Sequence, residues 1–150
     1  MNNLTEANIT HLLHVGDFAV YDIEKLFACY PQIQIFIARG NCDVNEEIIT
    51  AVQKLPNCTI AEIINLELSG IKIVASHIEN AIKKLPQKNS SFNDRENIDV
   101  FCYGHTHRTR LEKQGKKLIL NPGALCEDGR YFLLTLPELK VEQKFFNEKL

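Results

Sequence analysis

The order of apolar and polar positions predicts strands that alternate with helices in the first third of the chain. Two apolar runs, over residues 9–16 and 33–38, each end in a short polar sequence that begins with glycine or with arginine and glycine. After each run, apolar residues recur at helical spacing, over 21–30 and 45–55, and each of these stretches is followed by a proline. The pattern therefore predicts two strand–helix units in succession.

Beyond residue 57 the same pattern predicts mostly strands. A serine–glycine pair separates two strand-like runs and indicates a hairpin. The expected elements are strands 60–68 and 71–76, a short helix at 79–85, a polar loop at 86–97, and strands near 98–103, 108–112, 117–120, 130–136 and 140–146. No internal repeat or linker divides the chain, so we expect an α/β protein with a single domain over residues 1–150.

Charge and apolar runs exclude several classes of protein. The formal net charge of -2 gives no basic surface for nucleic acid. No apolar run approaches the roughly 18 residues that a membrane span needs, and residues 1–8 are polar, unlike a signal peptide. We therefore expect a cytoplasmic protein that binds neither a membrane nor nucleic acid.

The cysteines do not form a recognisable framework. They number five and contain no C-x-x-C pair, which argues against a disulfide scaffold and against a zinc finger. We expect most of them to be small buried apolar residues. They are Cys29, Cys42, Cys58, Cys102 and Cys126.

Four predicted strands are each followed by a side chain that can bind metal. These side chains are Asp17, Asn41, His77, and the pair His105 and His107. Ligands bind at the carboxyl ends of strands in open α/β sheets. A carboxylate, an amide oxygen and three imidazoles suit a borderline divalent ion such as Mn, Zn, Fe, Co or Ni. Each residue alone also fits a structural role, and it is their shared placement that favours one metal site.

In order and spacing, the chain resembles the calcineurin-like metallophosphoesterases, in particular their small bacterial and archaeal phosphodiesterase branch, to which the retromer scaffold subunit also belongs. The resemblance runs from about residue 9 to about residue 136. The motifs that carry it are Gly16-Asp17, Gly40-Asn41-Cys42-Asp43, Ser76-His77, Gly104-His105-Thr106-His107 and Asn121-Pro122-Gly123. It implies a two-sheet β-sandwich flanked by helices and a phosphate-ester substrate.

The resemblance also implies a role for each metal-capable residue. Asp17 would bridge two ions, Asn41, His77 and His105 would serve one of them, and His107 would serve the other. Two ions roughly 3.5–4 Å apart activate water for attack on phosphorus and neutralise the phosphoryl group. No side chain is assigned as catalytic, and one or two divalent ions are the expected cofactors.

Two features depart from the family pattern, and a third position, Cys42, is shared with the small branch but differs from many other relatives. The family's first strand, which ends in Asp-x-His, has no counterpart in this sequence, and this leaves the second ion only Asp17 and His107 as protein ligands. Cys42 stands where many relatives carry a histidine, and we interpret it as a packing residue. Ile78 replaces the glycine that usually follows the third-motif histidine, and its side chain would narrow the mouth of the site.

Two functions remain open at this point. The first is a metal-dependent phosphoesterase of the phosphodiesterase type, impaired by an incomplete second metal site. The alternative is an inactive protein of the same fold that serves as a binding or scaffold module. For the missing strand, three explanations remain: a longer natural chain, a degenerate relative that folds around the gap, or a second protomer that covers the open edge in a homo-oligomer.

Overall fold

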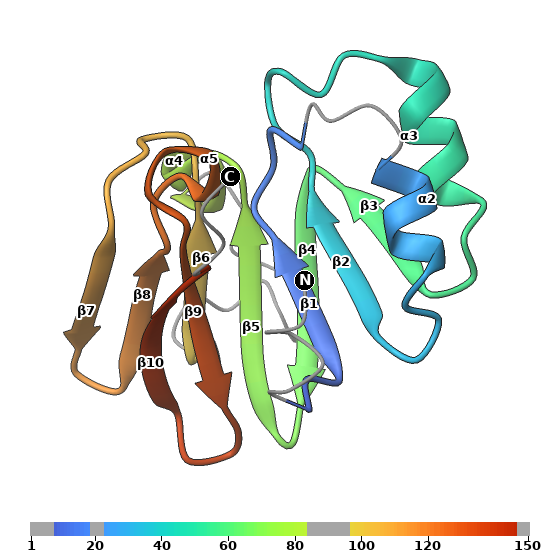
Figure 1. The fold of residues 1–150 in the computed structure, drawn as a ribbon. Helices are drawn as coiled ribbons and strands as arrows, with labels where there is room; N and C mark the ends of the chain where they lie inside the picture. The colour runs from blue at the N-terminus through green and yellow to red at the C-terminus, as the bar shows by residue number, and fades with distance from the viewer. Residues whose placement is uncertain (1–7, 19–22, 84–96, 147–150) are drawn as a thin grey trace.

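The computed structural model describes residues 8–18, 23–83 and 97–146 (Figure 1). The helices are α2 (Ile23–Ala28), α3 (Glu46–Gln53), α4 (Glu79–Lys83) and α5 (Leu125–Asp128). The strands are β1 (His11–His14), β2 (Gln34–Ala38), β3 (Cys58–Ala61), β4 (Ile63–Leu68), β5 (Ile71–Ser76), β6 (Val100–Tyr103), β7 (Arg110–Gln114), β8 (Lys117–Asn121), β9 (Arg130–Thr135) and β10 (Lys140–Phe145).

The two predicted strand–helix units form a parallel sheet in the order β1-β2-β3. Leu13 of β1 lies opposite Phe36 of β2, and Ile37 of β2 lies opposite Ile60 of β3. Helices α2 and α3 cover one face of this sheet (Figure 1) and bury their apolar residues against it, among them Phe27 and Val52. Because β1 and β2 are parallel, the loops that follow them emerge at the same edge.

The second sheet has five strands in the order β4-β5-β6-β8-β7. Its middle strands β5, β6 and β8 are parallel, and the outer strands β4 and β7 are antiparallel to their neighbours. Ser76 at the end of β5 lies opposite Tyr103 at the end of β6. This register brings the residues that follow each strand, His77 and Gly104, to the same edge.

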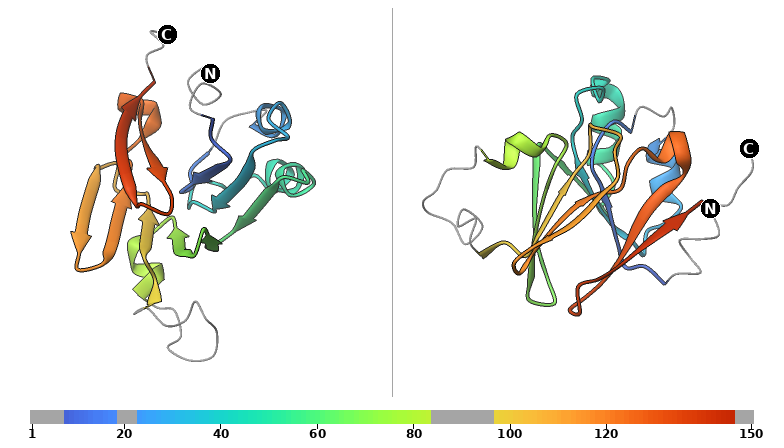
Figure 2. Two further views of the ribbon diagram at one scale, coloured as in Figure 1. Left: turned by 90° about the horizontal axis from the view of Figure 1, so that it is seen from below. Right: turned by 90° about the vertical axis from the view of Figure 1, so that its left-hand side faces the viewer.

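A core between two layers joins the sheets. Leu13 and Phe36 from the first sheet, and Phe132 and Leu134 from the antiparallel β9–β10 hairpin, pack against the same cluster of five-stranded-sheet residues. The hairpin lies beside β1 in the layer opposite the five-stranded sheet (Figure 2, left). The expected α/β sandwich is therefore confirmed, with one layer made of two sheets. Among the described residues, β1 pairs only with β2 and β9 only with β10.

One predicted strand is in fact two. The run over residues 60–68 is divided at Glu62 into the end of β3 and the whole of β4, which belong to different sheets. The chain passes here from one layer to the other without a glycine or proline, so the apolar pattern carries no sign of the break. Helix α5 was not predicted. The predicted loop at 86–97 lies outside the described residues except for Asn97, as do residues 84 and 85 of the predicted helix.

None of the described helices is long and apolar enough to cross a lipid bilayer.

The prediction that most cysteines are buried is wrong. Cys102 alone is buried, Cys58 is half-buried, and Cys29, Cys42 and Cys126 are exposed. Cys29 follows α2 and Cys126 lies in α5, and both helices are short elements at the surface of the sheets. Periodicity could not place them, because a cysteine beside a helix end has no fixed face.

We predict that Cys102 resists alkylation in the folded protein. Burial raises the pKa of this thiol to about 12, so the reactive thiolate is scarce near pH 8. Cys29 and Cys126, which are exposed, should be modified by iodoacetamide under the same conditions. Peptide mass mapping of native and urea-unfolded protein measures this, and equal labelling of Cys102 in both states would contradict it.

Candidate functional site

A buried carboxylate joins the loops that follow β1 and β2. Asp43 is 4% exposed, and its carboxylate accepts hydrogen bonds from the backbone N–H groups of Asp17 at 2.9 Å, Phe18 at 2.8 Å and Gly40 at 2.7 Å. Hydrogen bonds to a charged acceptor are stronger than neutral ones. Sequence reasoning gave Asp43 no role. The available signal was an acidic residue in a tight Gly-Asn-Cys-Asp turn, where aspartate commonly accepts from nearby backbone groups.

Two glycines allow these loops to touch. A Cβ atom on Gly40 would lie 2.1 Å from Asp17 Oδ1, and one on Gly16 would lie 2.6 Å from His77 Nδ1. Gly16 also has φ +95°, a conformation that side chains disfavour. Both positions therefore require glycine for the backbone to pass this close to Asp17 and His77.

The His77 ring is oriented by a hydrogen bond across the two layers. The side chain is buried, and its Nδ1 lies 2.7 Å from the carbonyl oxygen of Val15. A carbonyl can only accept, so Nδ1 carries a proton, and in the neutral form of the ring this leaves the lone pair on Nε2. That Nε2 atom lies 2.9 Å from Asn41 Oδ1, 3.2 Å from His105 Nδ1 and 3.3 Å from Asp17 Oδ2.

Four predicted residues, Asp17, Asn41, His77 and His105, thus meet around one point. Asn41 Oδ1 and His105 Nδ1 are themselves 3.0 Å apart. Ligand atoms bound to one ion at about 2.0–2.2 Å lie about 3 Å from one another, which matches these separations. Among the described residues, no three His, Cys, Asp or Glu side chains form a metal group by themselves; the oxygen of Asn41 lies within hydrogen-bond distance of both imidazoles and completes the cluster.

The fifth predicted residue, His107, makes a different contact. Its Nδ1 lies 2.5 Å from Oε1 of Glu127 in α5, and the two side chains are 51% and 57% exposed. In the described part of the chain, no hydrogen bond or ion pair joins His107 to the other four predicted residues. His105 and His107 both have positive φ, 64° and 56°, which turns the backbone sharply at each of them.

Asn121 holds the loop that carries these two histidines. Its side chain is fully buried, and Nδ2 donates to the Gly104 carbonyl at 2.9 Å and to Thr106 Oγ1 at 3.1 Å. Gly104 in turn donates its N–H to the carbonyl oxygen of His77 at 3.0 Å. A chain of hydrogen bonds therefore runs from Asn121 through Gly104 to His77. The sequence placed Asn121 in a motif but indicated no role.

Two titratable side chains flank the cluster. The negative charge of Asp17 is the main cause that raises the pKa of the Cys42 thiol, so the thiol stays protonated and is a poor nucleophile. Cys42 is exposed, which does not fit the packing role expected for it. Burial lowers the pKa of His14, and its neutral Nδ1 accepts the N–H of Gly16 at 3.1 Å. His14 thus shapes the end of β1.

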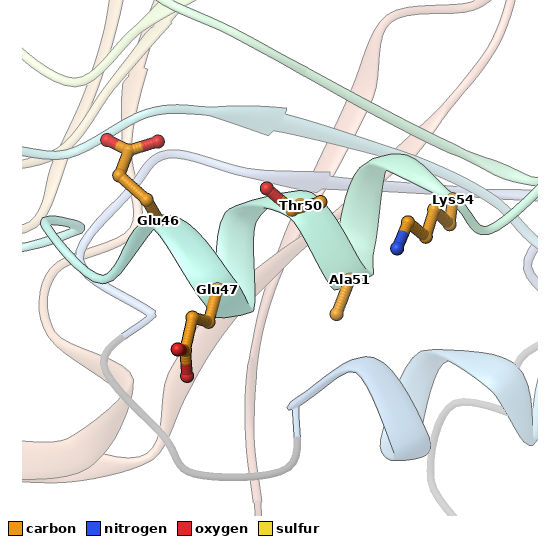
Figure 3. A pocket seen from close by; sticks show the side chains of 5 residues that line it. All are labelled: Glu46, Glu47, Thr50, Ala51 and Lys54. Carbon is orange, nitrogen blue, oxygen red and sulfur yellow. The ribbon is translucent and has the colours of Figure 1, made fainter.

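Two hollows lie on the surface, and neither is lined by the metal-capable residues themselves. One, of about 540 Å³, lies on the outer face of α3 (Figure 3) and includes none of the predicted site residues; it is lined by Glu46, Glu47, Thr50, Ala51 and Lys54. The other, of about 500 Å³, adjoins the loop that follows β6; it is lined by Tyr103, Thr106, Arg108, Thr109 and Arg110. None of the predicted site residues lines the second hollow either, but Thr106, which stands between His105 and His107 in the chain, does.

Comparison with known proteins gives a family match and several proteins of similar fold. The model of the calcineurin-like phosphoesterase superfamily domain matches residues 1–139. Phosphodiesterase MJ0936 of Methanocaldococcus jannaschii is 25% identical over 95% of this chain and 83% of its own. A solved archaeal phosphodiesterase superposes with a TM-score of 0.67 at 22% identity, covering 97% of this chain and 88% of that one. Vacuolar protein sorting 29 of Cryptosporidium parvum gives 0.56 at 18% identity, over 99% and 89%.

We predict that Asp43→Asn lowers the free energy of unfolding by about 2 kcal/mol, because an amide nitrogen would face at least one backbone N–H that then loses its acceptor. Urea unfolding measures the change. Glu46→Gln is the matched control: its partner Arg39 lies at 2.6 Å, but Glu46 is 71% exposed, so the loss should stay below about 1 kcal/mol. Equal losses in the two variants would show that Asp43 has no special role.

Proposed function

The chain belongs to the calcineurin-like phosphoesterase superfamily, and we propose that it is a hydrolase of the phosphodiesterase type that uses a divalent metal ion. In this proposal residues 1–150 act as one domain, and Asp17, Asn41, His77 and His105 hold the ion. The substrate is a phosphate ester.

The observation that carries the proposal is the set of short contacts at His77 Nε2. This lone pair faces the Asn41 oxygen at 2.9 Å and the Asp17 oxygen at 3.3 Å. A proton on Nε2 would serve only one of these acceptors at a time, whereas a cation placed among them faces them all. Imidazole, amide and carboxylate donors together suit Mn, Zn, Fe, Co or Ni.

The chain's own residues would prepare this position for chemistry on a phosphate ester. A bound divalent ion supplies Lewis acidity, which polarises the phosphoryl group and makes water a better nucleophile. The Val15 carbonyl keeps the His77 ring in one tautomer and one orientation. The N–H of Cys42, 2.9 Å from Asp17 Oδ1, fixes that carboxylate and leaves its Oδ2 toward His77.

The proposal includes a second ion, which would have fewer protein ligands than the first. His107 and Asp17 would hold it, with His107 released from its contact with Glu127 or sharing it. Two protein ligands bind a divalent ion weakly compared with four. We therefore propose that the position at His77 is the better occupied of the two.

One observation favours the alternative of a non-catalytic binding module. Val44 and Ile78 follow Asp43 and His77 directly, and these apolar residues are 73% and 42% exposed. Exposed apolar side chains beside a site are also found where proteins bind one another. The exposed Ile78 side chain is compatible with the expected narrowing of the site mouth as well, so activity must separate the two functions.

We predict that the protein binds Mn²⁺ and that His105→Ala raises the Kd at least about tenfold, since even changes behind the ligands weaken metal binding about 10–100-fold. His105 is exposed, so the variant should fold. Isothermal titration calorimetry measures the Kd. The control is His11→Ala, which removes an exposed histidine from β1.

Equal affinity in wild type and His105→Ala would remove this residue from the ligand set. The anomalous signal of Mn²⁺ in soaked crystals provides an independent check of position. A strong peak beside His107, with none near His77, would show that the two positions are assigned the wrong way round.

We predict Mn²⁺-dependent hydrolysis of bis(p-nitrophenyl) phosphate, with kcat/KM reduced at least about a hundredfold in Asn41→Ala, equivalent to about 2.7 kcal/mol of transition-state stabilisation. Asn41 supplies the oxygen that lies within 3.0 Å of both imidazoles. Asn65→Ala, an exposed position in β4, should retain the wild-type rate. If the wild-type protein binds Mn²⁺ tightly but hydrolyses the ester no faster than Asn41→Ala, the result would instead support the binding module.

A further inference from the structure

We propose that the hollow beside the His105–His107 loop binds a second phosphate group of the substrate, and that Arg108 recognises it. This inference rests on the proposed function and adds a substrate class to it: phosphate esters whose non-reacting part carries another phosphate. The hollow has a volume of about 500 Å³, and no carboxylate lines it.

One of the two arginines in the hollow is already neutralised. Arg110 Nε and Nη2 donate to Glu112 Oε2 at 2.8 and 2.5 Å, and Nη1 donates to Glu79 Oε1 at 3.2 Å. Two carboxylates thus fix the guanidinium and more than balance its single charge. The Arg110 side chain is therefore held in place at one side of the hollow. Its contact with Glu79 links β7 to α4, the helix that follows His77.

The other arginine, Arg108, has no carboxylate partner in the part of the chain that the structure describes. Arg108 is exposed, and within the described residues only its backbone N–H makes a hydrogen bond, to Thr106 Oγ1 at 3.3 Å. Among the described residues its guanidinium has no carboxylate partner, so it offers an unpaired positive charge to a ligand in the hollow. A guanidinium can donate two parallel hydrogen bonds to a phosphate, which makes arginine a specific ligand for that group.

Two hydroxyl groups in the lining have a proton left to donate. Thr106 Oγ1 accepts from Asn121 Nδ2 at 3.1 Å and from the Arg108 N–H. Tyr103 Oη accepts from Arg110 Nη1 at 3.1 Å. Within the described residues neither hydroxyl donates a hydrogen bond, so each O–H is available as a donor to a ligand. Thr109 differs, since its hydroxyl donates to the Pro122 carbonyl at 3.3 Å and accepts from Arg130.

The hollow and the metal-capable cluster share one loop. Thr106 lines the hollow and stands between His105 and His107 in the chain. The loop leaves the end of β6, at the same edge as His77 after β5. In this proposal a single ester places its reacting phosphate at the cluster and its second phosphate at Arg108, three residues after His105 in the same loop.

The test compares two esters that differ only in the second phosphate. Thymidine 5′-(p-nitrophenyl phosphate) lacks it, and the same compound with a 3′-phosphate carries it; both release p-nitrophenolate. We expect wild type with Mn²⁺ to show at least about tenfold higher kcat/KM for the 3′-phosphorylated ester, mainly through KM. Arg108→Ala should abolish this preference and leave the rate on the ester without the 3′-phosphate unchanged. Arg108→Lys should retain part of the preference. Lys113→Ala, an equal charge change on β7, should retain all of the preference.

The outcomes separate the second-phosphate proposal from the hydrolase function. If both esters are cleaved and the wild-type preference is absent, or survives in Arg108→Ala, the second-phosphate proposal is overturned while the hydrolase function stands. If neither ester is cleaved, hydrolysis of bis(p-nitrophenyl) phosphate decides the hydrolase function, and calorimetry with thymidine 3′,5′-bisphosphate decides the hollow separately. Binding weakened about tenfold in Arg108→Ala but not in Lys113→Ala supports the site; no binding, or no difference, overturns it.

Discussion

The structure depends on one carboxylate that accepts three backbone hydrogen bonds. Asp43 contacts the N–H groups of Asp17, Phe18 and Gly40, and so fastens the end of β1 to the end of β2. With both loops fixed, Asp17 turns its carboxylate toward the other layer. A buried charge is stable only when hydrogen bonds replace its water, and three donors on two loops supply them. The geometry of the first half of the site follows from this single side chain.

The second half of the site meets the first because the backbone of each layer passes unusually close to the other. His77 Nδ1 reaches the Val15 carbonyl at 2.7 Å, and a Cβ on Gly104 would lie 2.8 Å from that same oxygen. One carbonyl group at the end of β1 is therefore the meeting point of the ends of β5 and β6. The predicted ligands come from four strands, but they share this one boundary between the layers.

The sequence predicted those parts of the fold that have a period or a chemical pattern. The strands and two main helices follow apolar spacing, and Asp17, Asn41, His77 and His105 could be placed together because each ends a strand. The local turn signal could have marked Asp43 as an acceptor for Gly40, but not for Asp17 and Phe18, which are 26 and 25 residues away in the sequence. The role of Asn121 could not be predicted, because its partners Gly104 and Thr106 are 17 and 15 residues away and no local pattern connects them. The break at Glu62 and the contact of the His107 side chain with Glu127 could likewise not be predicted, because both depend on backbone torsion angles and on the register between the layers.

The Val15–His77 contact has a thermodynamic consequence. Asp17 and Asn41 belong to one layer, and His77 and His105 to the other, so neither layer alone contains the complete donor set. A cation held by all four would bind only the docked state and would act as a reversible cross-link between the layers. By mass action, a ligand at a hundred times its Kd adds about 2.7 kcal/mol to the stability of the state it binds. The occupancy of the site would then report how tightly the two layers are docked, as well as what chemistry they perform.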